Sequence, residues 1–203
     1  MFGPNLKKHI NEFSRYVRNN QFEKTDNGSI YFSRAHAEAG GIYTHDVNGE
    51  DERSDHNIIC DEGLNYILNQ IMLTSAAAVP RTWYCMLHSG SGTPSAAITA
   101  ANYHATVTEI TSGSEGYSQA TRVLWVGDAV DTVNTEVVNL ASPAAFTIVT
   151  ATSLAVNGAG LTSISTKGST SGTLMSAGKF SATRTLANAD TFNLKYKVDF
   201  DAA

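Results

Sequence analysis

The chain has 203 residues, of which 42% are hydrophobic and only 16% are charged, and its formal net charge is −5. This length allows one large domain with an appended segment. The acidic balance predicts no basic surface for nucleic acid, and with no apolar run of about 18 residues we expect no transmembrane helix. Charged residues gather in positions 1–62, which predicts a charged N-terminal segment and a nearly neutral body.

The first predicted element is a helix within residues 5–22. Its apolar residues recur at spacings of four, three and four, which is the pattern of one helical face. These residues, the expected assembly surface of the arm, are Leu6, Ile10, Phe13 and Val17. Lys and Arg occupy neighbouring positions, a pattern also seen in helices that lie on membranes. Because the apolar stripe is narrow, we expect it to pack on its own body or on a neighbouring subunit.

A β-hairpin is predicted next, over residues 41–56. Asn48-Gly49 is the strongest two-residue signal for a hairpin turn. The returning strand is acidic and is expected to face solvent or a basic partner. The acidic contact residues are Glu50, Asp51, Glu52 and Asp55.

A short buried strand over residues 57–60 precedes the clearest helical pattern in the chain, for which Asp61 is the expected N-cap. The apolar positions of this helix are Leu64, Ile67, Leu68, Ile71 and Met72. We expect the helix to lie across one sheet and fill the core. Cys60 and Cys85 have no CxxC partner, so we interpret both as buried free thiols of a protein made in a reducing cytoplasm.

From residue 81 onward the pattern is that of a β-protein. Strands are predicted over residues 83–87, 121–126, 145–151, 172–180 and 192–200. The last of these alternates apolar and polar residues without a break, which is typical of a strand with one face on the core and one in water. The predicted fold class is mainly β: a β-sandwich or jelly-roll-like body with one core-covering helix and an N-terminal helical arm. The expected domains are an arm and linker, residues 1–40, and a body, residues 41–203.

The histidines and carboxylates form no recognisable catalytic or metal-binding motif. His36, His45 and His56 lie close in the sequence but lack the tight spacing of usual ligand pairs. His45 and His56 fall on opposite arms of the predicted hairpin, where they could face each other. Glu109 and Glu115 are the residue type that a glycosidase uses as its catalytic pair. The polar sequence around them favours the simpler interpretation that they are ordinary residues of a loop. We therefore predict no metal site, no cofactor and no enzymatic activity.

Two tyrosines are candidates for contact with glycans, because flat aromatic rings stack on sugar faces. Tyr103 and Tyr117 have small, polar neighbours, so they are the aromatic residues expected to be exposed. Packing in the core is the competing interpretation, since aromatic residues at strand positions are usually buried. Trp83 and Trp125 could join the same aromatic platform, and the core interpretation applies to all four residues.

The order of the motifs resembles that of tailed-bacteriophage virion proteins over roughly residues 41–200. The motifs are the hairpin, Asn57 to Leu64 (NIICDEGL), Trp83 to Leu87 (WYCML), Thr93-Pro94, Tyr117 to Arg122 followed by Trp125, and Gly172 to Phe180 with Arg184 and the alternating last strand. The resemblance implies a structural role in the tail, neck or fibre apparatus or on the capsid shell. It implies no catalytic residues.

The sequence therefore supports hypotheses from two classes. The first is a non-enzymatic virion component: a tail- or neck-attached fibre or adaptor protein that docks through its N-terminal arm, or alternatively a capsid decoration protein that clamps capsid subunits. Its expected partners are other virion proteins and further copies of itself, and its expected location is the virion. The second is a carbohydrate-binding module that recognises glycans on the host surface.

Overall fold

The computed structural model describes residues 23–24, 30–31, 37–72 and 82–202. The predicted arm helix, with Leu6, Ile10, Phe13 and Val17, lies outside the described residues. The chain divides into two units, one of residues 39–200 and one of residues 1–38 with 201–203. In the smaller unit, β1 (Glu23–Lys24) and β2 (Ile30–Tyr31) pair as a short antiparallel ladder.

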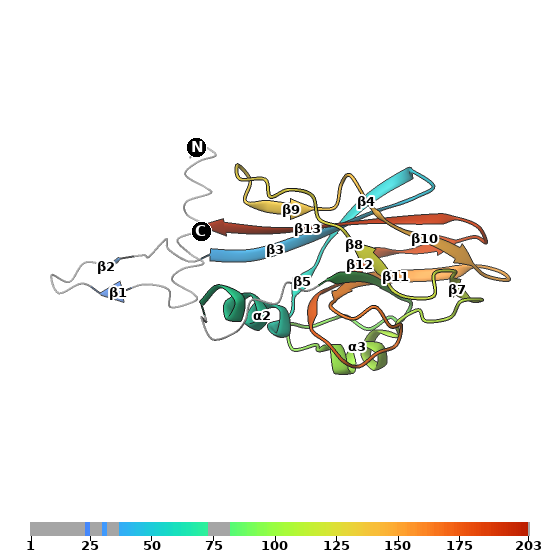
Figure 1. Ribbon diagram of the computed structural model, residues 1–203, viewed down its shortest axis with the longest axis horizontal. Helices are drawn as coiled ribbons and strands as arrows, with labels where there is room; N and C mark the ends of the chain where they lie inside the picture. Colours follow the sequence, from blue (N-terminus) through green and yellow to red (C-terminus); the bar gives the residue numbers. More distant parts are fainter. Residues whose placement is uncertain (1–22, 25–29, 32–36, 73–81, 203) are drawn as a thin grey trace, which may run out of the picture. The chain divides into compact units, whose positions relative to one another are not determined.

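The larger unit is a sandwich of two antiparallel sheets (Figure 1). The first sheet has the order β4-β3-β13-β10-β7, and β9 pairs with β13 beside this path. Its strands are β3 (Ala37–Val47), β4 (Glu50–His56), β7 (Gly116–Tyr117), β9 (Glu136–Val138), β10 (Ala144–Val149) and β13 (Thr191–Ala202). The second sheet has the order β5-β12-β11-β6-β8. Its strands are β5 (Ile58–Ile59), β6 (Trp83–His88), β8 (Val123–Trp125), β11 (Leu154–Thr162) and β12 (Leu174–Leu186). The predicted fold class, mainly β and sandwich-like, is confirmed.

Local sequence patterns explain two of these elements directly. In β13 the side chains of Phe192, Leu194 and Tyr196 are fully buried, and the intervening lysines point to the other face, as the period of two requires. The predicted hairpin of β3 and β4 turns at Asn48 and Gly49, whose φ angles of 55° and 82° fit the type I′ turn that Asn-Gly favours. Both predictions are confirmed.

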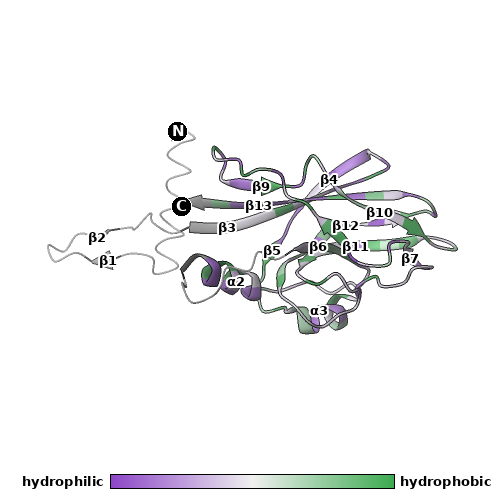
Figure 2. Ribbon diagram, viewed as in Figure 1, coloured by the Kyte–Doolittle hydropathy of each residue, from purple (hydrophilic) through white to green (hydrophobic). Residues whose placement is uncertain are grey.

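The main core lies between the two sheets, where Figure 2 shows apolar residues along the facing strands. The first sheet supplies mostly large rings, including Tyr43, Phe146, Phe192 and Tyr196. The second supplies mostly aliphatic side chains, including Leu87, Val156 and Leu161, together with the ring of Phe180. Side chains alternate between the two faces of each strand, so every second residue points inward. The inward residues of the two sheets therefore pack together in one continuous cluster.

A second apolar cluster covers the other face of the five-stranded sheet. It includes Met86, Tyr103, Val107 and Leu174, and it is closed by α3 (Ala100–Val107), a helix that the sequence patterns did not predict. Met86 points into this cluster while its neighbours Cys85 and Leu87 are buried, the latter two in the main core. This explains why residues 83–87 of β6 are all apolar or aromatic.

The predicted helix is present as α2 (Asp61–Met72), and it packs on β12. Gly63 allows the close approach, because a Cβ there would collide with the backbone of Met175. The Glu62 carboxylate accepts hydrogen bonds from the backbone N–H groups of Ala100 and Leu174, both at 2.9 Å, and so joins α2 to α3 and β12. The expectation that Leu64 and Leu68 fill the core is wrong: they are 36% and 57% exposed, because α2 rests on the sheet by one side only.

Candidate functional site: the 126–140 hairpin and the outer face of the six-stranded sheet

The exposed apolar surface of the body is concentrated on one segment, the 126–140 hairpin, and on the strand that leads into it. Seven large hydrophobic side chains are exposed among the described residues, and five of them lie between positions 124 and 140. These are Leu124, Val126, Val130, Val133 and Leu140. Val133, at the tip, is 88% exposed. Exposed apolar side chains concentrated on one segment are typical of a contact site for another molecule.

The 126–140 hairpin is firmly built. The backbone N–H of Asp128 donates to the Val138 carbonyl at 2.7 Å, and the Asp128 carboxylate accepts from the N–H groups of Leu140 and Ala141. At the tip, the carboxylate of Asp131 accepts hydrogen bonds from the backbone N–H of Val133 and from the backbone N–H and side-chain amide of Asn134. These bonds hold the pKa of Asp131 below its ordinary value. The exposed valines therefore stand on an ordered support.

Strand β9 attaches this hairpin to the rest of the sheet. Val138 pairs with Lys197 of β13, and the Trp125 indole at the base of the segment donates to the Tyr196 carbonyl at 3.3 Å. The hairpin thus extends the six-stranded sheet at one side. Its residues Val138 and Leu140 face the same side as the outward lysines of β13.

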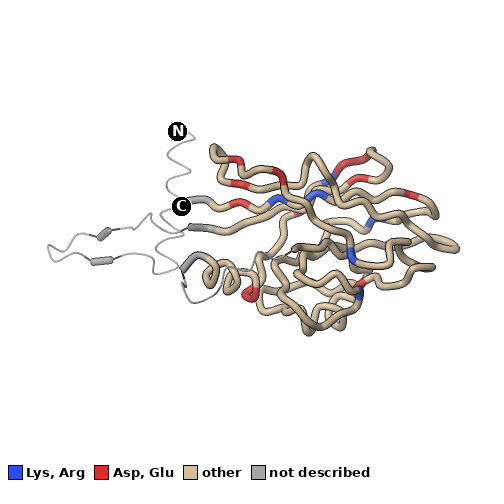
Figure 3. The backbone as a smooth tube through the Cα atoms, viewed as in Figure 1, with Lys and Arg blue, Asp and Glu red and all other residues tan. Residues whose placement is uncertain are grey.

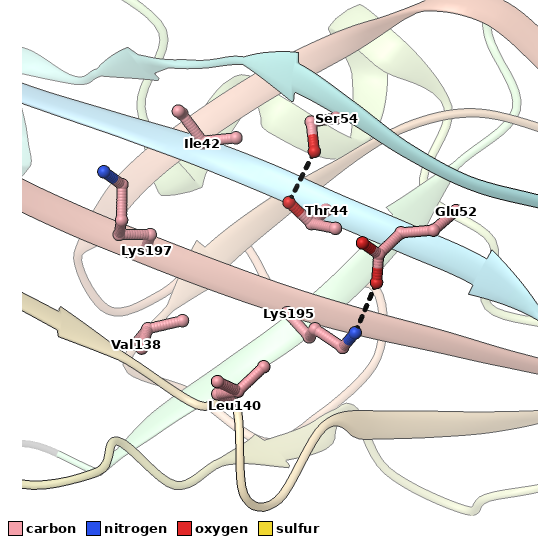
Figure 4. A pocket seen from close by; sticks show the side chains of 8 residues that line it. All are labelled: Ile42, Thr44, Glu52, Ser54, Val138, Leu140, Lys195 and Lys197. Carbon is pink, nitrogen blue, oxygen red and sulfur yellow. Dashed lines mark hydrogen bonds and ion pairs between the residues drawn. The ribbon is translucent and has the colours of Figure 1, made fainter. Parts of the chain in front are cut away.

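A pocket of about 250 Å³ lies where the hairpin meets the outer face of this sheet (Figure 4). Its lining comes from β3, β4, β13 and the hairpin and consists of Ile42, Thr44, Glu52, Ser54, Val138, Leu140, Lys195 and Lys197. The hydroxyls of Thr44 and Ser54 are hydrogen-bonded to each other at 2.8 Å. The aliphatic side chains of Ile42, Val138 and Leu140 give the pocket an apolar wall.

The charges at the pocket are paired but carry a carboxylate excess. Lys195 Nζ lies 2.5 Å from a carboxylate oxygen of Glu52, and Lys197 binds both Glu136 and Asp199, at 3.0 and 3.1 Å. Hydrogen bonds to Glu136 and then Asp199 raise the pKa of Lys197, so it stays charged. We call Glu52, Glu136 and Asp199 the acidic rim. Figure 3 shows that further acidic residues lie along β4 and the 126–140 hairpin.

Only part of the predicted acidic contact segment is exposed. Glu50, Asp51 and Glu52 are exposed, and Asp51 forms ion pairs with Arg53 and Arg184. Asp55, by contrast, is only 9% exposed; it accepts a hydrogen bond from the Ser181 N–H at 2.7 Å. The expectation that Asp55 faces solvent or a partner is therefore wrong, because its side chain turns inward to β12.

The prediction that Tyr103 and Tyr117 are exposed is also wrong. Tyr103 is 1% exposed on the buried face of α3, and Tyr117 is 0% exposed with its ring edge-on to Phe146. Lys167 Nζ covers the Tyr117 ring, 3.5 Å from its centroid. Small polar neighbours in the sequence indicated exposure, but Tyr103 lies on the buried face of α3 and Tyr117 lies in the buried strand β7. Neither tyrosine is accessible to a glycan.

The histidines and glutamates considered for chemistry have structural contacts. His45 is fully buried and paired to Asp55, whereas His56 is opposite Ile42, so the two histidines do not face each other across the hairpin. Glu109 forms a buried bidentate ion pair with Arg122, with both N···O distances 2.7 Å. Glu115 accepts hydrogen bonds from Thr150 and Ala151. No group of three or more potential metal ligands occurs within the described ranges, and His36 lies outside them.

The 126–140 hairpin is the feature that sequence reasoning missed. Its segment has turn-forming Asp and Asn residues on either side of isolated valines, for example Asp131, Val133 and Asn134. Asx turns fix such a loop, so an apolar residue between the turn residues is held outward. That local pattern was available, but it did not indicate that the sheet face beside it would form a pocket.

Comparisons with known proteins identify no relative from sequence. No protein-family model matches the chain, and no curated protein is significantly similar to it. Neither helix in the described part of the chain has the length and apolar character needed to span a bilayer.

Proposed function

We propose that the protein is a non-enzymatic structural component of a tailed-phage virion, attached at the tail or neck as a fibre or adaptor protein. The observation that carries the proposal is the 126–140 hairpin: its exposed apolar side chains stand on a rigid support next to an open pocket. An apolar surface of this kind loses contact with water when a partner covers it, which stabilises a complex by about 25 cal/mol for each Å² buried.

The ionisable groups inside the body support a structural role. Glu109 and Arg122 join the loop after α3 to the loop around Ser169, and Arg184 joins β12 to the β3–β4 hairpin. Such contacts rigidify a scaffold. The order of motifs over residues 41–200 resembles that of tailed-phage virion proteins, and this resemblance is the reason for proposing a virion as the location.

The test is incorporation into particles. In a phage that encodes the protein, the variant Val133→Asp with Leu140→Asp is expected to be absent from purified virions, because two charges replace the apolar contact surface. The matched control is Thr132→Asp with Ala141→Asp, which adds the same charges at exposed neighbouring positions and should be incorporated. Thermal unfolding of each variant shows whether the body still folds.

The position of the protein in wild-type particles completes the test. Electron microscopy of particles labelled at the protein should place it on the tail or neck. Label on the capsid faces would overturn that placement in favour of capsid decoration. Absence of the wild-type protein from particles would overturn the virion role. Incorporation of the Val133→Asp/Leu140→Asp variant at the wild-type level would overturn the proposed contact surface.

A further inference from the structure

The pocket beside the 126–140 hairpin is large enough for a bulky apolar side chain. Its volume is about 250 Å³, whereas a cavity of about 150 Å³ can take up benzene. Ile42, Val138 and Leu140 supply apolar contacts, and Leu140 is itself 61% exposed, so the pocket continues onto the exposed hairpin. An occupant with one large apolar side chain and further apolar residues beside it would cover both the pocket and the exposed part of the hairpin.

The charge of the surroundings narrows the choice of occupant. Residues 39–200 contain 14 Asp or Glu and 8 Lys or Arg, a formal charge of −6. At the pocket the lysines are neutralised by the acidic rim, which leaves three carboxylates for two ammonium groups. A basic, amphipathic segment therefore complements this surface better than an acidic or uncharged one.

One segment of the chain itself has that character. Residues 5–22 contain four Lys or Arg and one Glu, a formal charge of +3. Their apolar stripe places Phe13 between Ile10 and Val17. An 18-residue helix is about 27 Å long, which is longer than a pocket of about 250 Å³ is wide. The positive charge of this segment complements the acidic rim, and Phe13 supplies a large apolar side chain for the pocket.

We propose that residues 5–22 of a second copy of this chain dock on the pocket and the 126–140 hairpin, with Phe13 in the pocket and the basic side chains at the acidic rim. The proposal deepens the proposed structural role and rests on it: a segment that docked on its own body would link no subunits, whereas docking on a neighbour joins copies into an assembly. The same surface thereby acts as the receptor for the arm.

Disulfide trapping between two separately made full-length proteins tests this docking. One carries Phe13→Cys and the other Leu140→Cys. The native thiols do not compete, because Cys60 and Cys85 are fully buried and burial raises the pKa of Cys60 to about 12. On mixing under mild oxidation, we expect a Phe13→Cys/Leu140→Cys heterodimer at least ten times more abundant than in two controls. The controls replace Leu140→Cys by Leu68→Cys on α2, or Phe13→Cys by Asn11→Cys beside the stripe.

Heterodimers no more abundant than in the controls would overturn the proposal. So would a Phe13→Cys/Leu140→Cys double variant that forms its disulfide only within one chain. Light scattering provides a second measurement without cysteines: wild-type protein should self-associate, more weakly as salt increases, and Phe13→Asp should not. If the disulfide does not form but the wild-type protein is present in virions, only the proposed docking of the arm is wrong. If the disulfide forms but the protein is absent from virions, only the virion role is wrong.

Discussion

The guanidinium Nε of Arg184 lies 3.1 Å from Nδ1 of His45, between the two sheets and 139 positions apart in the chain. An Arg N–H can only donate, so Nδ1 of His45 is the acceptor and carries no proton. Nε2 of His45 then donates to Asp55 at 3.1 Å. The ring is neutral, stacked near Phe180 and Phe192, and protonation would place a second N–H against Arg184.

This arrangement predicts a loss of stability in mild acid. Burial lowers the pKa of His45, and Arg184 acts in the same direction while the hydrogen bond to Asp55 partly offsets both. Burial also lowers the pKa of His88, to about 4. The unfolded chain binds these protons near pH 6.5, so stability is fully present above about pH 7 and falls as the pH decreases. For His88 alone the loss amounts to roughly 3 kcal/mol at pH 4.

Urea unfolding between pH 7.5 and pH 5 measures this effect before most carboxylates titrate. The slope of stability against pH should be smaller in His88→Gln than in the wild type, and unchanged in the control His56→Gln, whose residue is exposed. A wild-type free energy of unfolding that is constant over this range would contradict the assignment of neutral, buried histidines.

Arg184→Met should be among the most damaging single substitutions. Arg184 is 4% exposed and donates to His45 Nδ1, to the His45 carbonyl and to the carboxylate and carbonyl of Asp51. Its loss leaves the buried acceptors of His45 without donors, and we expect a cost of about 2–4 kcal/mol in the free energy of unfolding. The control is Arg53→Met, which removes another partner of Asp51 from an exposed site and should cost less than about 1 kcal/mol.

The buried pair of Glu109 and Arg122 offers a double-mutant test. The side chains are 0% and 3% exposed, so removing either partner leaves the other charge buried. Glu109→Leu and Arg122→Leu should each cost about 3–5 kcal/mol, and the double variant should cost much less than their sum. Chemical denaturation of the four proteins measures the coupling. Additive costs would show that the two groups act independently.

Gly158→Ala should destabilise the five-stranded sheet. A Cβ at position 158 would overlap the Gly178 carbonyl oxygen and the His88 ring, and the first of these is backbone, which cannot move without distorting the β11–β12 ladder. We expect a cost of at least about 2 kcal/mol. Gly113→Ala is the matched control, because nothing lies within 4 Å of its Cβ and its φ is not positive; it should be neutral or slightly stabilising. Equal thermal midpoints for the two variants would contradict the close contact.

The elements that the sequence predicted are those with local causes. The alternation of β13, the Asn48-Gly49 turn and the helical spacing of α2 each depend on neighbouring residues, because backbone geometry sets the period and the turn chemistry. The short helix α3 lacked such a pattern. It has eight residues, too few to show a clear apolar period, and its position depends on the sheet that it covers.

The surface and the buried polar network were decided only by the tertiary structure. Tyr103 is buried because its helix, α3, packs on the five-stranded sheet, and Tyr117 is buried because its ring packs on Phe146. No local pattern reports what distant segments cover. The Asp55 side chain points inward because the backbone N–H of Ser181 and the ring of His45 donate hydrogen bonds to it there. For the same reason the pocket beside the 126–140 hairpin could not be predicted. It forms where three segments far apart in the chain meet, the β3–β4 hairpin, the 126–140 hairpin and β13, and only their packing brings its walls together.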